Sequence, residues 1–170
     1  MYERTARQKT GDFVNSKVWE GEVQTWLPSY VDSRTSSTTE LDFYIPGAYV
    51  EAKEKNQPIG PRWDLPCEEV HAFIIDELSV RKAMLKFPLA YFVLHDVPQQ
   101  RVFLARVDEM ALASATRLQR VGKGKRVVDL RNFRQLIDPA LELWPAICAD
   151  QLEMSWKRSE CLTALPIRQV

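Results

Sequence analysis

Three charged residues have the types and the spacing that phosphate chemistry needs. Asp42 is followed nine residues later by Glu51, and Lys53 comes two residues after Glu51. Two neighbouring carboxylates repel each other unless a divalent cation lies between them, and Mg²⁺ prefers oxygen ligands of this kind. A bound Mg²⁺ would activate a water molecule and offset phosphate charge, while an amine would orient the water or stabilise the transition state. The pattern predicts hydrolysis of a phosphodiester bond.

A predicted hairpin brings these three residues together. Residues 40–45 (ELDFYI) and 48–53 (AYVEAK) are rich in aromatic and β-branched residues, and a Pro-Gly turn signal separates them. Side chains two positions apart on a strand point to the same face, so the glutamate and the lysine share a face that the aspartate can approach. The alternative is an exposed hairpin whose charged run, residues 51–55, faces only solvent.

Hydrophobic spacing and turn residues predict further elements on both sides of the hairpin. Before it, apolar residues at helical spacing predict a helix from Asp12 until Pro28, and residues 32–39 are expected to form a polar loop. After it we expect a Pro-rich loop over residues 56–66 and a long helix over 67–86. Two strands over 89–95 and 101–107 follow, and then a shorter helix over 109–119 that Asp108 caps. The basic segment 117–126 is expected to be an exposed loop, and Asp138-Pro139 to start a helix that runs to about residue 160.

The hairpin and the helix before it resemble the core of the PD-(D/E)XK nuclease superfamily over roughly residues 12–107. The resemblance implies an α/β, restriction-endonuclease-like fold: a mixed central sheet flanked by helices in the order α-β-β-β-α-β, here with extra C-terminal helices. It also implies that Asp42, Glu51 and the backbone carbonyl of Ala52 bind Mg²⁺, for which Mn²⁺ can substitute, and that Lys53 assists catalysis. Leu41 stands in place of the proline in the family name, which many members also lack.

The same resemblance implies two further positions in the site. Many members carry a glutamate on the first helix, with apolar residues three and seven positions later, and Glu20 with Val23 and Leu27 matches that phase. Glu22 is the alternative, because the helix boundary and phase are open. The helix after the lysine often contributes another polar side chain, for which the candidates are Glu69, His71 and Lys82.

Several residues are candidates for contact with DNA. Lysine and arginine side chains can hold the phosphate backbone without reading bases, and an exposed tryptophan can stack on a base. A loop with serine and arginine before Asp42 is weakly similar to a DNA-holding loop of the archaeal Holliday-junction resolvase branch. For the basic segment, an ordinary solvated loop is an equal alternative. The candidates are Arg34, Ser36, Arg62, Trp63, Lys123, Lys125 and Arg126.

Length and charge limit the class of protein. The chain has 170 residues, 45% of them hydrophobic, and a formal net charge of zero. This length suits a single domain, in which we distinguish a polar arm (1–11), a catalytic core (12–107) and a mostly helical C-terminal extension (108–170). Zero net charge argues against DNA binding through bulk charge. No apolar stretch predicts a signal peptide or a membrane helix, so we expect a cytoplasmic protein without membrane contact.

Together these features predict a Mg²⁺-dependent nuclease that hydrolyses DNA. An endonuclease is favoured over an exonuclease, because the chain is small and contains no recognisable helicase or processivity element. A homodimer stays open, since small members of the superfamily are often dimers that cut both strands. The alternative is a catalytically silent nucleic-acid-binding or assembly domain of the same fold, against which the intact Asp42, Glu51 and Lys53 argue.

Overall fold

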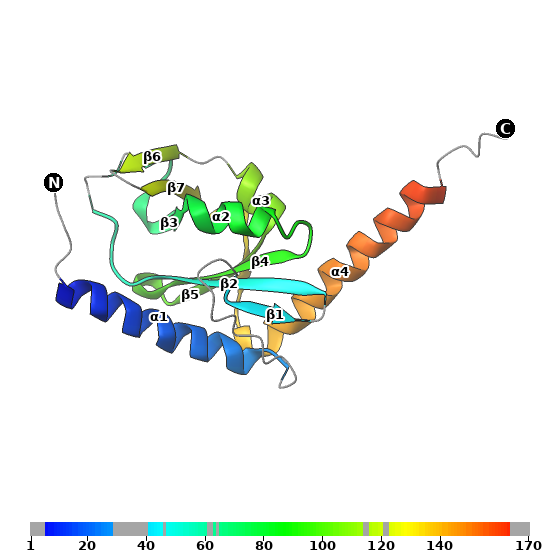
Figure 1. The fold of residues 1–170 in the computed structure, drawn as a ribbon, viewed down its shortest axis with the longest axis horizontal. Helices are drawn as coiled ribbons and strands as arrows, with labels where there is room; N and C mark the ends of the chain where they lie inside the picture. Colours follow the sequence, from blue (N-terminus) through cyan, green and yellow to red (C-terminus); the bar gives the residue numbers. More distant parts are fainter. Residues whose placement is uncertain are drawn as a thin grey trace.

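The computed structural model of the protein describes residues 6–28, 41–45, 47–60, 63, 65–113, 116–120 and 123–163. Figure 1 shows a layered α/β arrangement, with helix α1 (Ala6–Trp26) along one face of a central sheet. Helices α2 (Glu77–Met84) and α3 (Val107–Leu112) lie on the other side of that sheet. The last helix, α4 (Pro139–Thr163), starts beside the sheet and projects away from the body of the molecule.

The central sheet is mixed and has five strands in the order β1-β2-β4-β5-β8. β2 runs parallel to β4, and the other neighbouring strands pair antiparallel. This mixed sheet flanked by helices confirms the predicted fold class. The strands are β1 (Phe43–Ile45), β2 (Ala48–Lys55), β4 (Ala90–Asp96), β5 (Arg101–Arg106) and β8 (Arg134–Leu136).

A second, three-stranded antiparallel sheet lies over the side of the central sheet that carries α2. Its order is β3-β7-β6, with β3 at Ala72–Asp76, β7 at Lys123–Asp129 and β6 at Thr116–Arg120. β7 passes so close to α2 that a Cβ atom placed on Gly124 would lie 2.3 Å from Oε2 of Glu77. A side chain at position 124 would therefore displace the carboxylate of Glu77 from its present position.

Two hydrophobic cores hold the layers together, one on each face of the central sheet. On the first face, Trp19 and Val23 of α1 and Leu143 of α4 pack against Val50 and Val93 of the strands. On the second face, side chains of α2, α3, β3 and β7 cover Phe92, Leu94 and Phe103. Burial on both faces explains why β4 is a continuous apolar run, as expected for a central strand.

The elements around the hairpin lie close to where the sequence predicts them. β1 and β2 form the expected antiparallel pair, and Gly47 has the positive φ of 84° that the connecting turn requires. β4, β5 and the start of α4 also agree with prediction, and Pro145 lies inside α4 without ending it. Asp138 acts at the start of α4 as expected, because its Oδ1 accepts a hydrogen bond from the Leu141 amide at 3.3 Å.

The long helix predicted over residues 67–86 is wrong. The segment instead contains a 3₁₀ helix (Glu69–His71), strand β3 and the shorter helix α2. The apolar residues of Ala72–Ile75 satisfy a strand as well as a helix, and pairing with β7 decides in favour of the strand. β3 therefore adds a strand between the hairpin and α2, but it belongs to the second sheet and not to the central one.

Three other boundaries differ from prediction. α1 begins at Ala6, so Asp12 lies inside the helix and part of the expected arm is helical. α3 begins at Val107 and is shorter than predicted, with Glu109 accepting a hydrogen bond from the Arg106 amide at 2.8 Å. The basic segment 117–126 is not a loop, because most of it belongs to β6 and β7. The C-terminal extension, expected to be mostly helical, thus carries three strands besides its helices.

A fully buried carboxylate ties the central sheet to β3. Asp96, at the end of β4, is 0% exposed and forms ion pairs with Lys55 at 2.8 Å and with Arg101 at 2.7 Å. Lys55 also donates to the Ala72 carbonyl at 3.1 Å, and Arg101 donates to the Val70 carbonyl at 2.5 Å. The two cations therefore connect one buried carboxylate to the chain that leads into β3.

We predict that Asp96→Asn lowers the free energy of unfolding by about 3 kcal/mol or more, because it leaves two buried cations without their counter-charge. Urea denaturation followed by circular dichroism measures this loss. Arg81→Ala is the matched control, since it breaks an exposed pair with Glu77 and costs no more than about 0.5 kcal/mol. Equal losses for the two variants would contradict a structural role for Asp96.

Candidate active site

β2 presents Glu51 and Lys53 on the face of the sheet that carries β3 and α2. Glu51 is only 5% exposed, and its Oε1 lies 2.7 Å from Nζ of Lys53. In the parallel register Glu51 is next to Phe92 and Lys53 is next to Leu94, both of which are buried. The ion pair between Glu51 and Lys53 thus lies beside buried apolar side chains of β4.

Asp42 joins them where the β1–β2 ladder ends. The last antiparallel pair is Phe43 with Val50, and a continued ladder would place Leu41 opposite Ala52. Instead, the Ala52 amide donates to Oδ2 of Asp42 at 2.7 Å. The side chain of Asp42 therefore replaces a backbone partner, which fixes its carboxylate beside the strand that carries Glu51 and Lys53.

The charges of these three residues influence one another strongly. The pKa of Asp42 is raised to about 6, first by burial and then by the negative charges of Glu51 and Glu20. The charge of Lys53 and the hydrogen bond from Ala52 oppose this rise. Burial opposes the charge of Lys53, but the carboxylates of Glu51 and Asp42 outweigh it and raise the pKa of Lys53. Lys53 is therefore a stable cation at neutral pH, and Asp42 is ionised at an electrostatic cost.

Glu20 faces the same region from α1. It is 7% exposed, whereas Glu22 lies on the exposed side of the helix, so the structure places the first of the two alternatives toward the sheet. Its carboxylate accepts a hydrogen bond from Ser16 at 3.0 Å and pairs with Lys17 at 2.5 Å. Glu20 therefore adds negative charge next to Asp42 while its own oxygens contact other residues of α1.

The donor set at Asp42 and Glu51 fits a hard divalent cation. Both groups offer carboxylate oxygens, and the charge of Glu51 is, after burial, the largest cause that raises the pKa of Asp42. Within the described ranges, no three acidic, histidine or cysteine side chains lie close enough to share one metal ion. A cation at this point would therefore depend on two carboxylates, with backbone oxygen and water completing its shell, which is the kind of coordination that Mg²⁺ accepts.

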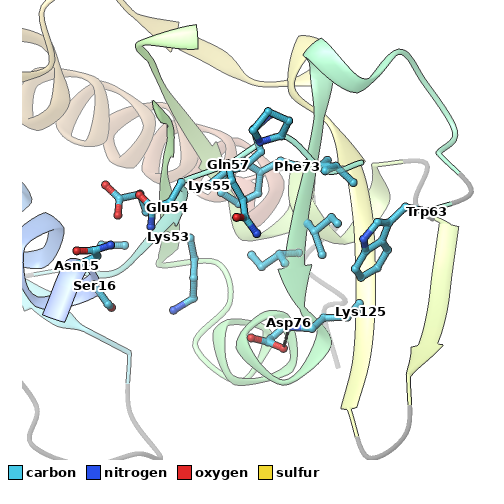
Figure 2. Close-up of a pocket in the computed structure, with 16 residues that line it drawn as sticks. Asn15, Ser16, Lys53, Glu54, Lys55, Gln57, Trp63, Phe73, Asp76 and Lys125 are labelled. Atoms are coloured by element: carbon cyan, nitrogen blue, oxygen red, sulfur yellow. Dashed lines mark hydrogen bonds and ion pairs between the residues drawn. The ribbon is translucent and has the colours of Figure 1, made fainter. Parts of the chain in front are cut away.

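A cleft of about 660 Å³ opens beside these residues. Figure 2 shows Lys53 and Lys55 along β2, Asn15 and Ser16 on α1, and Trp63 on the opposite side. The far wall is built by β3 and the Lys125 position of β7. Among the described residues, β1 pairs with β2 no further than Val50, so Lys53 and Lys55 lie beyond the end of that ladder.

Asp76 is a site residue that the sequence did not reveal. It ends β3, lines the cleft, and pairs with Lys125 at 2.5 Å, as the dashed line in Figure 2 marks. Its negative charge also helps to raise the pKa of Lys53. The sequence assigned this stretch to the middle of a helix, so the aspartate that ends an apolar run was not recognised as the end of a strand.

The other predicted contact residues have different positions. Trp63 and Lys125 line the cleft, whereas Arg126 donates to the Ala111 carbonyl at 3.2 Å, beside α3. Lys123 begins β7, and only its backbone position is described. The remaining three, Arg34, Ser36 and Arg62, lie outside the described residues.

The sequence offered three candidates for a polar side chain that the helix after Lys53 would add to the site, and none of them lines the cleft. Glu69 accepts hydrogen bonds from the amides of Ile59 at 2.6 Å and Gly60 at 3.2 Å, so it holds the loop that borders the cleft. His71 ends the 3₁₀ helix before β3, and Lys82 lies on α2. The polar group from this part of the chain that does face the cleft is Asp76.

The fold is similar to that of a nuclease from a fusselovirus. The two structures superimpose with a TM-score of 0.39 at 8% sequence identity, covering 83% of this chain and 94% of the viral chain. No protein-family model matches the sequence, and no curated protein matches it. Among the described helices, none is both long and apolar enough to cross a membrane.

We predict that Mg²⁺ raises the melting temperature more at pH 7.5 than at pH 5. The folded-state pKa of Asp42 lies near 6, above its ordinary value of 3.8, so the metal-free protein loses stability as pH rises through this range. Mg²⁺ at Asp42 would bind the ionised carboxylate and would offset that loss only where the proton has left. Differential scanning fluorimetry at matched ionic strength measures the effect. A shift that is equal at both pH values, or unchanged in Asp42→Asn, would contradict a cation site at Asp42.

Proposed function

We propose that the protein is a metal-dependent nuclease that hydrolyses phosphodiester bonds in DNA. The observation that carries this proposal is the convergence of three charged groups on β2 and beside it, next to a cleft. Glu51 and Lys53 form an ion pair at 2.7 Å, and the carboxylate of Asp42 accepts a hydrogen bond at 2.7 Å from the amide of Ala52, which lies between them in sequence. Two carboxylates and one protonated amine form a constellation suited to phosphoryl chemistry. The buried position of Glu51 argues against a solvated charge run.

Each residue has a distinct part in the proposed reaction. Asp42, Glu51 and the backbone carbonyl of Ala52 would hold Mg²⁺, which supplies charge neutralisation at the phosphate and lowers the pKa of water. Glu51 also fixes the ammonium group of Lys53 through its 2.7 Å ion pair. Because its pKa is raised, Lys53 acts as a proton-bearing donor that binds a phosphate oxygen or orients the attacking water, and not as a general base.

We predict that Lys53→Ala reduces cleavage by about 100-fold or more, because it removes a donor placed for the charged transition state. The assay uses a panel of labelled DNA duplexes, flaps, junctions and single strands in Mg²⁺ or Mn²⁺. Lys86→Ala is the matched control, since Lys86 lies over the Tyr49 ring and does not line the cleft. Undiminished cleavage by Lys53→Ala would overturn the proposed mechanism. A wild type that binds the panel but cleaves none of it would instead indicate the silent binding domain.

Asp42→Asn separates activity from stability. We predict that this variant loses cleavage while its melting temperature at pH 7.5 stays equal or rises. Asparagine can still accept the hydrogen bond from the Ala52 amide, and it removes the charge that burial and Glu51 disfavour. Thermal unfolding and the cleavage assay on the same preparation test both parts. A large fall in melting temperature would show that the ionised carboxylate stabilises the fold, contrary to this account.

A further inference from the structure

The cleft beside Lys53 has two walls of different chemistry. The wall formed by β2 carries Lys53 and Lys55, whereas the opposite side presents the indole of Trp63 (Figure 2). Ile59 and Phe73 also line the cleft and add apolar surface. Its volume of about 660 Å³ lies within the ~300–1,000 Å³ that proteins use to enclose a small organic ligand. A nucleotide would suit both walls, because its base has an apolar face that can contact the indole and its phosphate is an anion that a lysine can bind.

The loop up to Gly60, three residues before Trp63 in the sequence, is anchored. Oε1 of Glu69 accepts hydrogen bonds from the amides of Ile59 and Gly60, at 2.6 and 3.2 Å. The φ of Gly60 is 74°, a left-handed conformation that glycine adopts without strain. The indole is half-buried at the edge of the cleft, so one part of it packs on protein while another part borders the open space.

Stacking on an indole requires a base whose face is accessible. Bases inside a duplex are stacked on their neighbours and paired, so an enzyme must unpair a base before a pocket can receive it. Proteins that bind single strands place successive bases on aromatic side chains and track the backbone with positive charge. Trp63 with Lys53 reproduces that combination within one cleft.

The charge balance of the cleft permits a phosphate backbone. Its lining includes three lysines and two carboxylates, Lys53, Lys55, Lys125, Glu54 and Asp76. Lys55 is held by the buried Asp96, so Lys53, which pairs with Glu51, and Lys125 are the cations placed to meet a phosphate. Lys125 and Asp76 are direct partners in the β3–β7 register and pair at 2.5 Å, which holds the ammonium group at the cleft. A lysine has three donors, so the ion pair leaves capacity for a phosphate oxygen.

We infer that the cleft accepts an unpaired nucleotide of a single DNA strand, whose base stacks on Trp63 while an adjacent phosphate meets Lys53. This inference rests on the proposed function for the identity of that phosphate as the one that is cleaved. It narrows the substrate to single-stranded DNA, or to the single-stranded part of a branched or frayed duplex.

The test combines a binding assay and a cleavage assay on Trp63→Ala, Trp63→Phe and wild type. Fluorescence anisotropy measures the affinity for short labelled oligo-dT and for a duplex of the same length, at fixed low salt and without Mg²⁺. Cleavage of the same molecules is measured in Mg²⁺. Trp144→Phe is the control, because Trp144 packs against the core on the other face of the sheet. Melting temperatures verify that each variant is folded.

We expect Trp63→Ala to weaken oligo-dT binding about tenfold or more, the loss that removal of one stacking partner commonly causes. Trp63→Phe should retain most of the affinity, and duplex binding should not depend on residue 63. Wild-type preference for duplex, or equal oligo-dT affinity in all folded variants, overturns the inference even if cleavage is observed. Residue-63-dependent binding without any cleavage supports the inference and overturns the proposed activity.

Discussion

The hydrogen bond from the Ala52 amide to the carboxylate of Asp42 is the interaction on which the site depends. It ends the β1–β2 ladder after Phe43 and Val50, because a side chain occupies the donor that the next backbone carbonyl would take. Two consequences follow from this single contact. The carboxylate is fixed beside the strand that carries Glu51 and Lys53, and among the described residues β1 pairs with β2 no further than Val50. The same contact therefore sets the position of Asp42 and the end of the β1–β2 ladder.

The second wall of the cleft depends on a buried ionic cluster. Asp96 holds Lys55 and Arg101, and each cation reaches a carbonyl in the chain that enters β3. Buried ion pairs add little to stability compared with apolar packing. They do fix the relative positions of their partners, because separating them leaves a buried charge unpaired, which is costly. The cluster thus serves to hold β3, and with it Asp76, at a set distance from β2.

The candidate site is in conflict with the stability of the fold. Asp42, Glu51 and Glu20 place negative charges in a largely buried region, and the pKa of Asp42 rises to about 6 as a result. Lys53 offsets part of this charge, which explains why its own pKa rises in spite of burial. Sites that must bind a cation or an anionic substrate commonly keep such unfavourable charge in the free protein. The surrounding strands, covered on both faces, compensate for it.

The sequence by itself determined the hairpin and the charges it carries. A turn signal between two short β-rich runs fixes the register, and the period of two puts Glu51 and Lys53 on one face, which are both local properties. It also determined β4, β5 and the start of α4, through apolar runs and a cap. Tertiary structure decided the rest. Ala72–Asp76 is ambiguous locally and becomes a strand because it pairs with β7, far along the sequence. Most of the basic segment at 117–126 pairs locally as the β6–β7 hairpin, and only Lys125 and Arg126 of it pair with β3. That long-range pairing is what places Asp76, Lys125 and the cleft beside Lys53, and no local pattern encodes it.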